Sequence, residues 1–156
     1  CLGSENTTFT PTGAYASQAI NNGAKKFIVS PLDAIMGRLG HQRIDLLKLD
    51  IEGYEWGIFD SHMGKIAQLR PFQLALEIHT QHANPHFVPP SKVAGRGTHA
   101  VHTLVRTLFA AGYHLLYKHS NSGDHACADL TFVHDDAVQI LMEGLCPGVP
   151  LSTSKG

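Results

Sequence analysis

The 156-residue sequence lacks the features that mark disulfide-rich, membrane-spanning or nucleic-acid-binding proteins. Its three cysteines are few and widely spaced, which excludes a disulfide framework and a paired CxxC metal site. No apolar run approaches the ~20 residues needed to cross a bilayer, so we expect no membrane segment in this chain. Twelve basic residues balance thirteen acidic ones, and without a basic excess nucleic acid is not an expected partner.

Aliphatic runs that alternate with amphipathic segments predict an α/β fold. Residues Ile44–Asp50 form a nearly continuous apolar run, which predicts a strand of a parallel sheet covered on both faces. A helix is expected over Tyr54–Leu69, and a second strand over Gln73–Ile78. A strand, a helix and a strand in this order predict a right-handed crossover, so the two strands should be adjacent and parallel.

Breaker residues and periodicity predict the remaining elements. We expect a loop over residues 1–23, a short strand over 27–29, a long loop over 80–97, and helices over 31–39, 98–111 and 136–145. Two further strands are expected over 113–117 and 128–133. The turn residues between them, at 121–124, favour antiparallel pairing.

The stretch IDLLKLDIEGYEW, at Ile44–Trp56, places a lysine inside an apolar strand and follows it with Asp, Glu, Gly and a later Glu. This pattern resembles the strand-four motif of FkbM-type methyltransferases and their methyltransferase-like relatives. The later patterns are similar to the last three strands of that family: LALEIH at Leu74–His79, then Gly112, Tyr113, Asn121, Cys127 and LTFV. The resemblance covers roughly Lys26 to Asp135.

The resemblance implies a Rossmann-like methyltransferase sheet, of which this chain supplies strands four to seven with the last strand antiparallel. It divides the chain into a partial methyltransferase domain over residues 1–135 and a C-terminal helix and tail over 136–156. It also implies methyl transfer from S-adenosylmethionine to an oxygen acceptor on a glycan or another small molecule.

The family's cofactor-binding elements are a glycine-rich loop after the first strand and an acid after the second. Neither appears before Ile44, and residues 1–3 resemble the end of the third strand. We therefore expect the N-terminal cofactor-binding strands to be missing from this chain. On this interpretation the chain alone binds the cofactor weakly and is inactive.

Two predicted strand ends carry the candidate site, because ligands of open α/β sheets bind outside the carboxyl ends of the strands. We predict that Asp50, Glu77 and His79 are catalytic, since a hydroxyl or amine acceptor needs a base near its proton. Asp50, Glu52 and Gly53 are the predicted cofactor-binding residues. The alternative role for Asp50 is to cap the next helix and order the loop, and no residue is assigned as a metal ligand.

Lys48 and the strand that carries it give two structural predictions. Because a buried ammonium is costly unless paired, we predict that Lys48 is buried, with its amine within about 4 Å of Asp50 or Glu77. In the family's complete sheet, the strand at residues 44–50 pairs with strand one. Its open edge therefore favours self-association, pairing with residues 1–29, or low stability.

Two hypotheses from other functional classes stay open. Asp50, Glu52, His79, His82 and His86 are residue types that bind metals, so a divalent metal serving hydrolysis is one alternative. A non-catalytic binding domain that keeps the fold is the other. Cofactor titration and metal analysis separate these hypotheses from methyl transfer.

Overall fold

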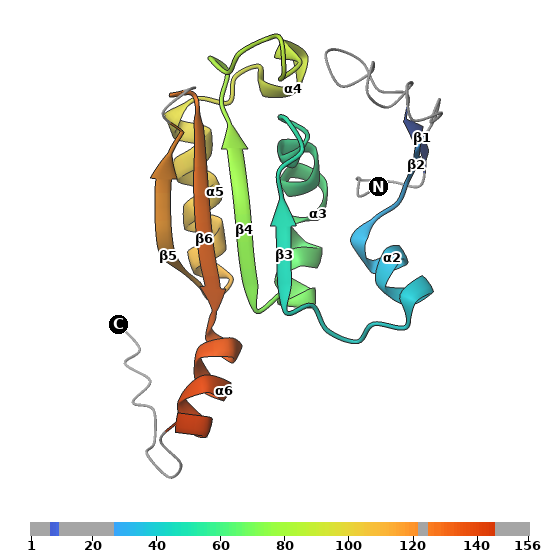
Figure 1. Cartoon of the computed structure of the whole chain (residues 1–156), viewed down its shortest axis with the longest axis vertical. Coiled ribbons are helices and arrows are strands. Elements are labelled where there is room, and N and C mark those ends of the chain that lie inside the picture. The colour runs from blue at the N-terminus through green and yellow to red at the C-terminus, as the bar shows by residue number, and fades with distance from the viewer. Residues whose placement is uncertain (1–6, 10–26, 122–124, 146–156) are drawn as a thin grey trace.

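A four-stranded sheet forms the centre of the fold in the computed structural model, which describes residues 7–9, 27–121 and 125–145 (Figure 1). Its strands stand in the order β3-β4-β6-β5, where β3 is Leu46–Leu49, β4 is Gln73–His79, β5 is Tyr113–Ser120 and β6 is Cys127–His134. A separate two-stranded sheet pairs β1 (Thr7–Phe9) antiparallel with β2 (Phe27–Val29). The expected α/β class is therefore confirmed.

Strand pairing follows the prediction for both halves of the larger sheet. β3 and β4 are adjacent and parallel, with Leu46 opposite Gln73 and Leu49 opposite Leu76. β6 runs antiparallel to β4 on one side and to β5 on the other. The last strand of the sheet thus lies between two strands that precede it in the sequence.

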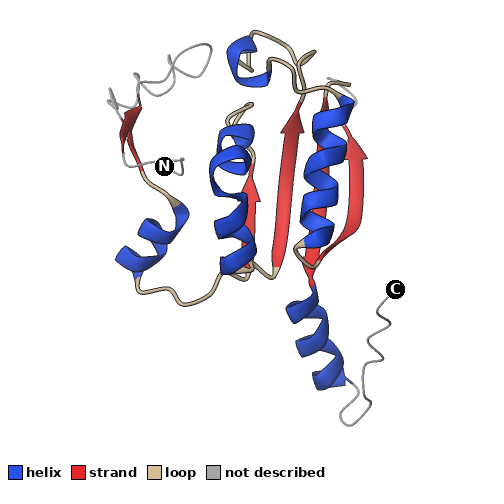
Figure 2. Cartoon of the chain, turned by 180° about the vertical axis from the view of Figure 1, so that it is seen from behind, coloured by secondary structure: helices blue, strands red, loops and turns tan. Residues whose placement is uncertain are grey.

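Five helices are described: α2 (Leu32–Leu39), α3 (Glu55–Leu69), α4 (Pro90–Val93), α5 (Thr98–Ala110) and α6 (Asp135–Leu145). α3 and α5 lie side by side on one face of the sheet, as Figure 2 shows from behind. α4 is a single short turn within the loop predicted over residues 80–97. In the part of the chain that the structure describes, no helix is both long and apolar enough to span a membrane.

The hydrophobic core fills the space between α3, α5 and the sheet. Alternate side chains of each central strand point into it, which is the expected geometry of pleated strands. Its fully buried members include Leu49, Leu74, Leu76, Ile78 and Phe132 from the strands and Ile66 and Leu108 from the helices. The same alternation sends the intervening side chains of β3, β4 and β6 to the opposite face, where no described helix packs (Figures 1 and 2).

This one-sided packing corrects two predictions. The apolar run of β3 is not covered on both faces, because buried and exposed residues alternate along it. Lys48 is not buried: 65% of its side chain is exposed, since it alternates with the buried Leu47 and Leu49 along β3. The predicted ion pair is confirmed, with Lys48 Nζ 3.3 Å from Asp50 Oδ2.

The N-terminal predictions are partly wrong and partly untested. The loop expected over residues 1–23 is wrong at Thr7–Phe9, which form β1 because their backbone pairs with β2. The proposed third-strand end at residues 1–3 lies outside the described residues, as do most of the turn residues between β5 and β6. The described strands β1 and β2 pair with each other and not with β3.

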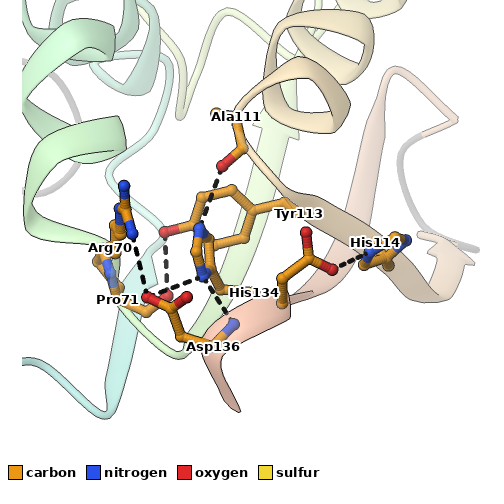
Figure 3. A network of polar contacts seen from close by, with 8 residues as sticks. Arg70, Pro71, Ala111, Tyr113, His114, His134 and Asp136 are labelled. Carbon is orange, nitrogen blue, oxygen red and sulfur yellow. Dashed lines mark hydrogen bonds and ion pairs between the residues drawn. The ribbon is translucent and has the colours of Figure 1, made fainter. Parts of the chain in front are cut away.

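A network of polar contacts joins the amino end of β4 to residues of β5, β6 and α6 (Figure 3). Tyr113 donates its hydroxyl hydrogen to the Pro71 carbonyl at 2.9 Å. The buried His134 lies with Nε2 3.1 Å from the Ala111 carbonyl, and its Nδ1 accepts the backbone N–H of Asp136. This network holds the end of the sheet that lies opposite the candidate site.

Candidate functional site

The turn from β3 into α3 contains two consecutive residues with left-handed backbone. Glu52 has a φ of 56° and Gly53 a φ of 89°. A Cβ atom on Gly53 would lie 2.7 Å from Val88 Cγ1 and 3.0 Å from Val93 Cγ1, which is too close for any side chain. The glycine therefore lets the loop after β4 pack against the turn that presents Asp50 and Glu52.

Asp50 and Glu77 lie together at the carboxyl ends of the parallel strands β3 and β4. The register that pairs Lys48 with Ala75 brings the two acids onto the same face, each two residues further along its strand. Their carboxyl groups are close enough for each to shift the pKa of the other, and Lys48 pairs with Asp50 from the same face. Two neighbouring carboxyls resist being ionised together, which favours a proton on one member of the pair.

The two carboxyls of this pair have opposite pKa shifts. Burial, followed by the hydrogen bond and charge of Asp50, raises the pKa of Glu77 to about 7. Burial acts to raise the pKa of Asp50 as well, but the hydrogen bonds from Glu77 and Lys48 outweigh it and lower that pKa below its ordinary value. Glu77 is thus the member that holds the proton and exchanges it near neutral pH.

His79 is buried within the site, with 3% of its side chain exposed. Its Nε2 lies 3.3 Å from Glu52 Oε2, and its Nδ1 lies 3.4 Å from Glu55 Oε1. Burial opposes the charged imidazolium, but the neighbouring carboxylates of Glu55, Glu52 and Glu77 outweigh burial and raise the pKa of His79. The indole N–H of Trp56 donates to the His79 carbonyl at 2.7 Å, which fixes the strand end against α3.

Glu55 belongs to the site, although the sequence analysis gave it no role there. It is fully buried at the start of α3, where its Oε1 accepts the backbone N–H of Ile51 at 2.7 Å. Its Oε2 has no hydrogen-bond partner. The signal for this residue was the later Glu of the strand-four motif, but its burial depends on how α3 meets β4.

The loop histidines do not join the cluster. His82 and His86 are both exposed, and the ring of His86 contacts Phe87 edge to face. The predicted residues Asp50, Glu52, Glu77 and His79 are brought together, whereas Gly53 contacts the neighbouring loop. The assembled group can exchange protons and presents several carboxylates to a ligand.

The family of the chain follows from comparison with known proteins. No curated protein and no solved structure matches it. Residues 3–115 match the family model described as the methyltransferase FkbM domain, and this range includes every residue of the site described above. Because the match covers more than half of the 156 residues, the chain belongs to the FkbM methyltransferase domain family, whose members are named for methyl transfer.

Proposed function

We propose that the chain contributes to methyl transfer from S-adenosylmethionine to an oxygen acceptor on a glycan or another small molecule. The observation that carries the proposal is the pair of neighbouring acids Asp50 and Glu77 beside buried His79. These groups lie at the carboxyl ends of adjacent parallel strands, where open α/β sheets bind their ligands. Membership of the FkbM family supplies the reaction class.

The strand order supports the Rossmann-like part of the proposal. We infer that β3, β4, β5 and β6 correspond to strands four to seven of the methyltransferase sheet, with β6 as the antiparallel last strand. In this interpretation β3 is the strand that would pair with strand one. No described strand occupies that side of β3.

The charge of the site suits the cofactor. S-adenosylmethionine supplies an electrophilic methyl group on a positively charged sulfonium. The side chains of Asp50 and Glu52 are 35% and 30% exposed, so both carboxylates are open to a cation or to ligand hydroxyls. We propose that these two residues contact the cofactor, while Gly53 acts indirectly by holding the turn that presents them.

The acid–base part of the mechanism belongs to Glu77 and His79. A base works best when its pKa lies near the working pH, and the Glu77 pKa of about 7 meets that condition. When ionised, the Glu77 carboxylate would accept the proton of the acceptor hydroxyl. The bound cofactor would supply the methyl group, and the bond broken would be the one between the methyl carbon and the sulfonium sulfur. His79 is held between Glu52 and Glu55, whose charges help to raise its pKa, and when protonated it would stabilise the ionised pair.

A binding experiment tests the cofactor contact without requiring turnover. Titration calorimetry of the full chain with S-adenosylmethionine should give weak binding, and Asp50→Asn should weaken it further because one carboxylate facing the sulfonium is lost. Asp45→Asn is the matched control, since Asp45 is exposed and lies just before β3, at the opposite end of that strand from Asp50. Equal affinities of wild type and Asp50→Asn would remove Asp50 from the cofactor site, and absence of binding would favour a non-catalytic domain.

A further inference from the structure

We propose that Glu77, His79 and Cys127 form a binding site for a divalent transition metal, with Zn²⁺ as the best fit. Each residue offers one ligand atom, and these three atoms lie within 4.8 Å of one another. The site goes beyond the proposed function and does not rest on it, because metal binding can be measured without methyl transfer. The sequence analysis grouped Glu77 and His79 with Asp50 but did not associate Cys127 with them.

The strand register brings the three side chains together. Cys127 lies directly opposite His79 in the antiparallel pair β4–β6, and Glu77 precedes His79 by two residues on the same face. Ligand atoms around a tetrahedral Zn²⁺ stand about 3–4 Å apart, given Zn–ligand distances of about 2.0–2.3 Å. The observed spread of 4.8 Å therefore needs only small side-chain movements to close around an ion.

The donor set selects the kind of metal. A thiolate and an imidazole bind Zn²⁺ and similar transition ions, whereas Mg²⁺ and Ca²⁺ prefer oxygen ligands alone. Three protein ligands with nitrogen, oxygen and sulfur donors also leave a fourth tetrahedral position open. His79 and Cys127 are both buried, so the ion would be largely withdrawn from water.

The surroundings of His79 match those of a metal-bound imidazole. Such a ring normally donates its second N–H to a carboxylate, which orients the ring and makes it a better ligand. Glu52 faces one ring nitrogen and Glu55 the other, so either nitrogen can bind metal while the other keeps a carboxylate partner. Buried Nδ1 of His79 has no hydrogen-bond partner, which is unusual for a buried polar atom.

The local charge also favours a cation. Four carboxyl groups, those of Asp50, Glu52, Glu55 and Glu77, lie around His79, and Lys48 pairs with Asp50. A divalent ion would compensate this negative charge and would displace the proton on Glu77. Glu77 therefore holds either a proton or the metal.

The test uses Co²⁺ as a spectroscopic probe in the full chain. The double substitution Cys1→Ser and Cys146→Ser leaves Cys127 as the only thiol, because the sequence has three cysteines. One equivalent of Co²⁺ should produce a thiolate-to-cobalt charge-transfer band and the strong visible absorption of four-coordinate cobalt. Zn²⁺ should displace the cobalt and abolish both signals.

Two variants and one control localise the ion in that background. Cys127→Ser should abolish the charge-transfer band, and His79→Gln should weaken Zn²⁺ binding by at least about tenfold, as expected for loss of a ligand. His82→Ala, an exposed histidine three residues further on, should leave binding unchanged. If the chain that retains only Cys127 shows no charge-transfer band, the proposal is overturned. It is also overturned if Cys127→Ser folds and binds Zn²⁺ with unchanged affinity.

Discussion

At the residue scale, the proton held by Glu77 links folding to pH. Its pKa of about 7 lies above the ordinary value of 4.5, so the folded chain binds more protons than the unfolded chain between these two pH values. The resulting stabilisation is complete below pH 4.5 and is lost as the pH rises through about 7. We predict that the stability advantage of wild type over Glu77→Gln decreases across this interval.

Urea denaturation of both proteins at several pH values measures that difference. Glu143→Gln, which changes an exposed glutamate of α6, serves as the control and should show no such pH-dependent difference from wild type. A difference between wild type and Glu77→Gln that stays constant or grows with pH would mean that Glu77 does not hold the proton.

Gly53 gives a second prediction at the residue scale. Gly53→Ala should destabilise the chain by about 1–3 kcal/mol, because the new Cβ meets Val88 and Val93 and the φ of 89° is strained for alanine. Gly57→Ala is the matched control, since Gly57 lies in α3 with nothing within 4 Å of its added Cβ. Alanine should stabilise that helix by up to about 1 kcal/mol. Thermal unfolding that ranks the two substitutions equally would contradict the packing described for the turn.

At the element scale, strands were predictable where aliphatic residues run together. The aliphatic runs of β3 and β4, separated by a helix, predicted that these two strands are parallel neighbours. The same prediction placed Asp50, Glu77 and His79 at one end of the pair. The exposure of Lys48 was not predictable, because a sequence does not show on which face of the sheet each helix packs. Cys127 was missed for a similar reason: its position opposite His79 depends on the register of a strand about fifty residues further along the chain.

The network at the amino end of β4 carries an element-scale prediction. Tyr113→Phe removes the hydrogen bond to the Pro71 carbonyl and leaves a buried acceptor without that donor. We expect a loss of about 1–3 kcal/mol of unfolding free energy. Tyr117→Phe, at an exposed position of the same strand, should cost far less. If both substitutions have the same effect in chemical denaturation, the network in Figure 3 does not stabilise the sheet.

At the scale of the whole molecule, the free side of β3 predicts self-association. Among the described strands β3 pairs only with β4, and Leu46 on it is 56% exposed. Unpaired edge strands offer backbone donors and acceptors to a second chain. Sedimentation equilibrium should therefore show concentration-dependent association, which Leu46→Lys should reduce because charge on an edge strand opposes pairing.

Leu145→Lys is the control for this experiment, because Leu145 is also exposed but lies at the end of α6. It should leave association through β3 unchanged. A wild-type chain that remains monomeric at all concentrations would show that this edge is protected.

The site as a whole was predictable only in part, for a physical reason. The resemblance and the strand-end rule identified four of the residues that the structure brings together, namely Asp50, Glu52, Glu77 and His79. Whether each carries a proton depends on burial and on neighbours supplied by other elements. The pKa shifts of Glu77 and His79 arise from the folded arrangement and leave no local pattern in the sequence.

The most direct test of the proposed site is carboxyl ¹³C NMR of the full chain, with the Glu77 signal assigned by its loss in Glu77→Gln. We predict that Glu77 titrates at about pH 7. S-adenosylmethionine should lower that pKa because its sulfonium favours the ionised carboxylate, whereas S-adenosylhomocysteine, which lacks the sulfonium charge, should lower it less. If Glu77 titrates near its ordinary value of 4.5, it does not hold the proton at neutral pH. If its pKa is the same with either ligand, the cofactor does not lie beside it.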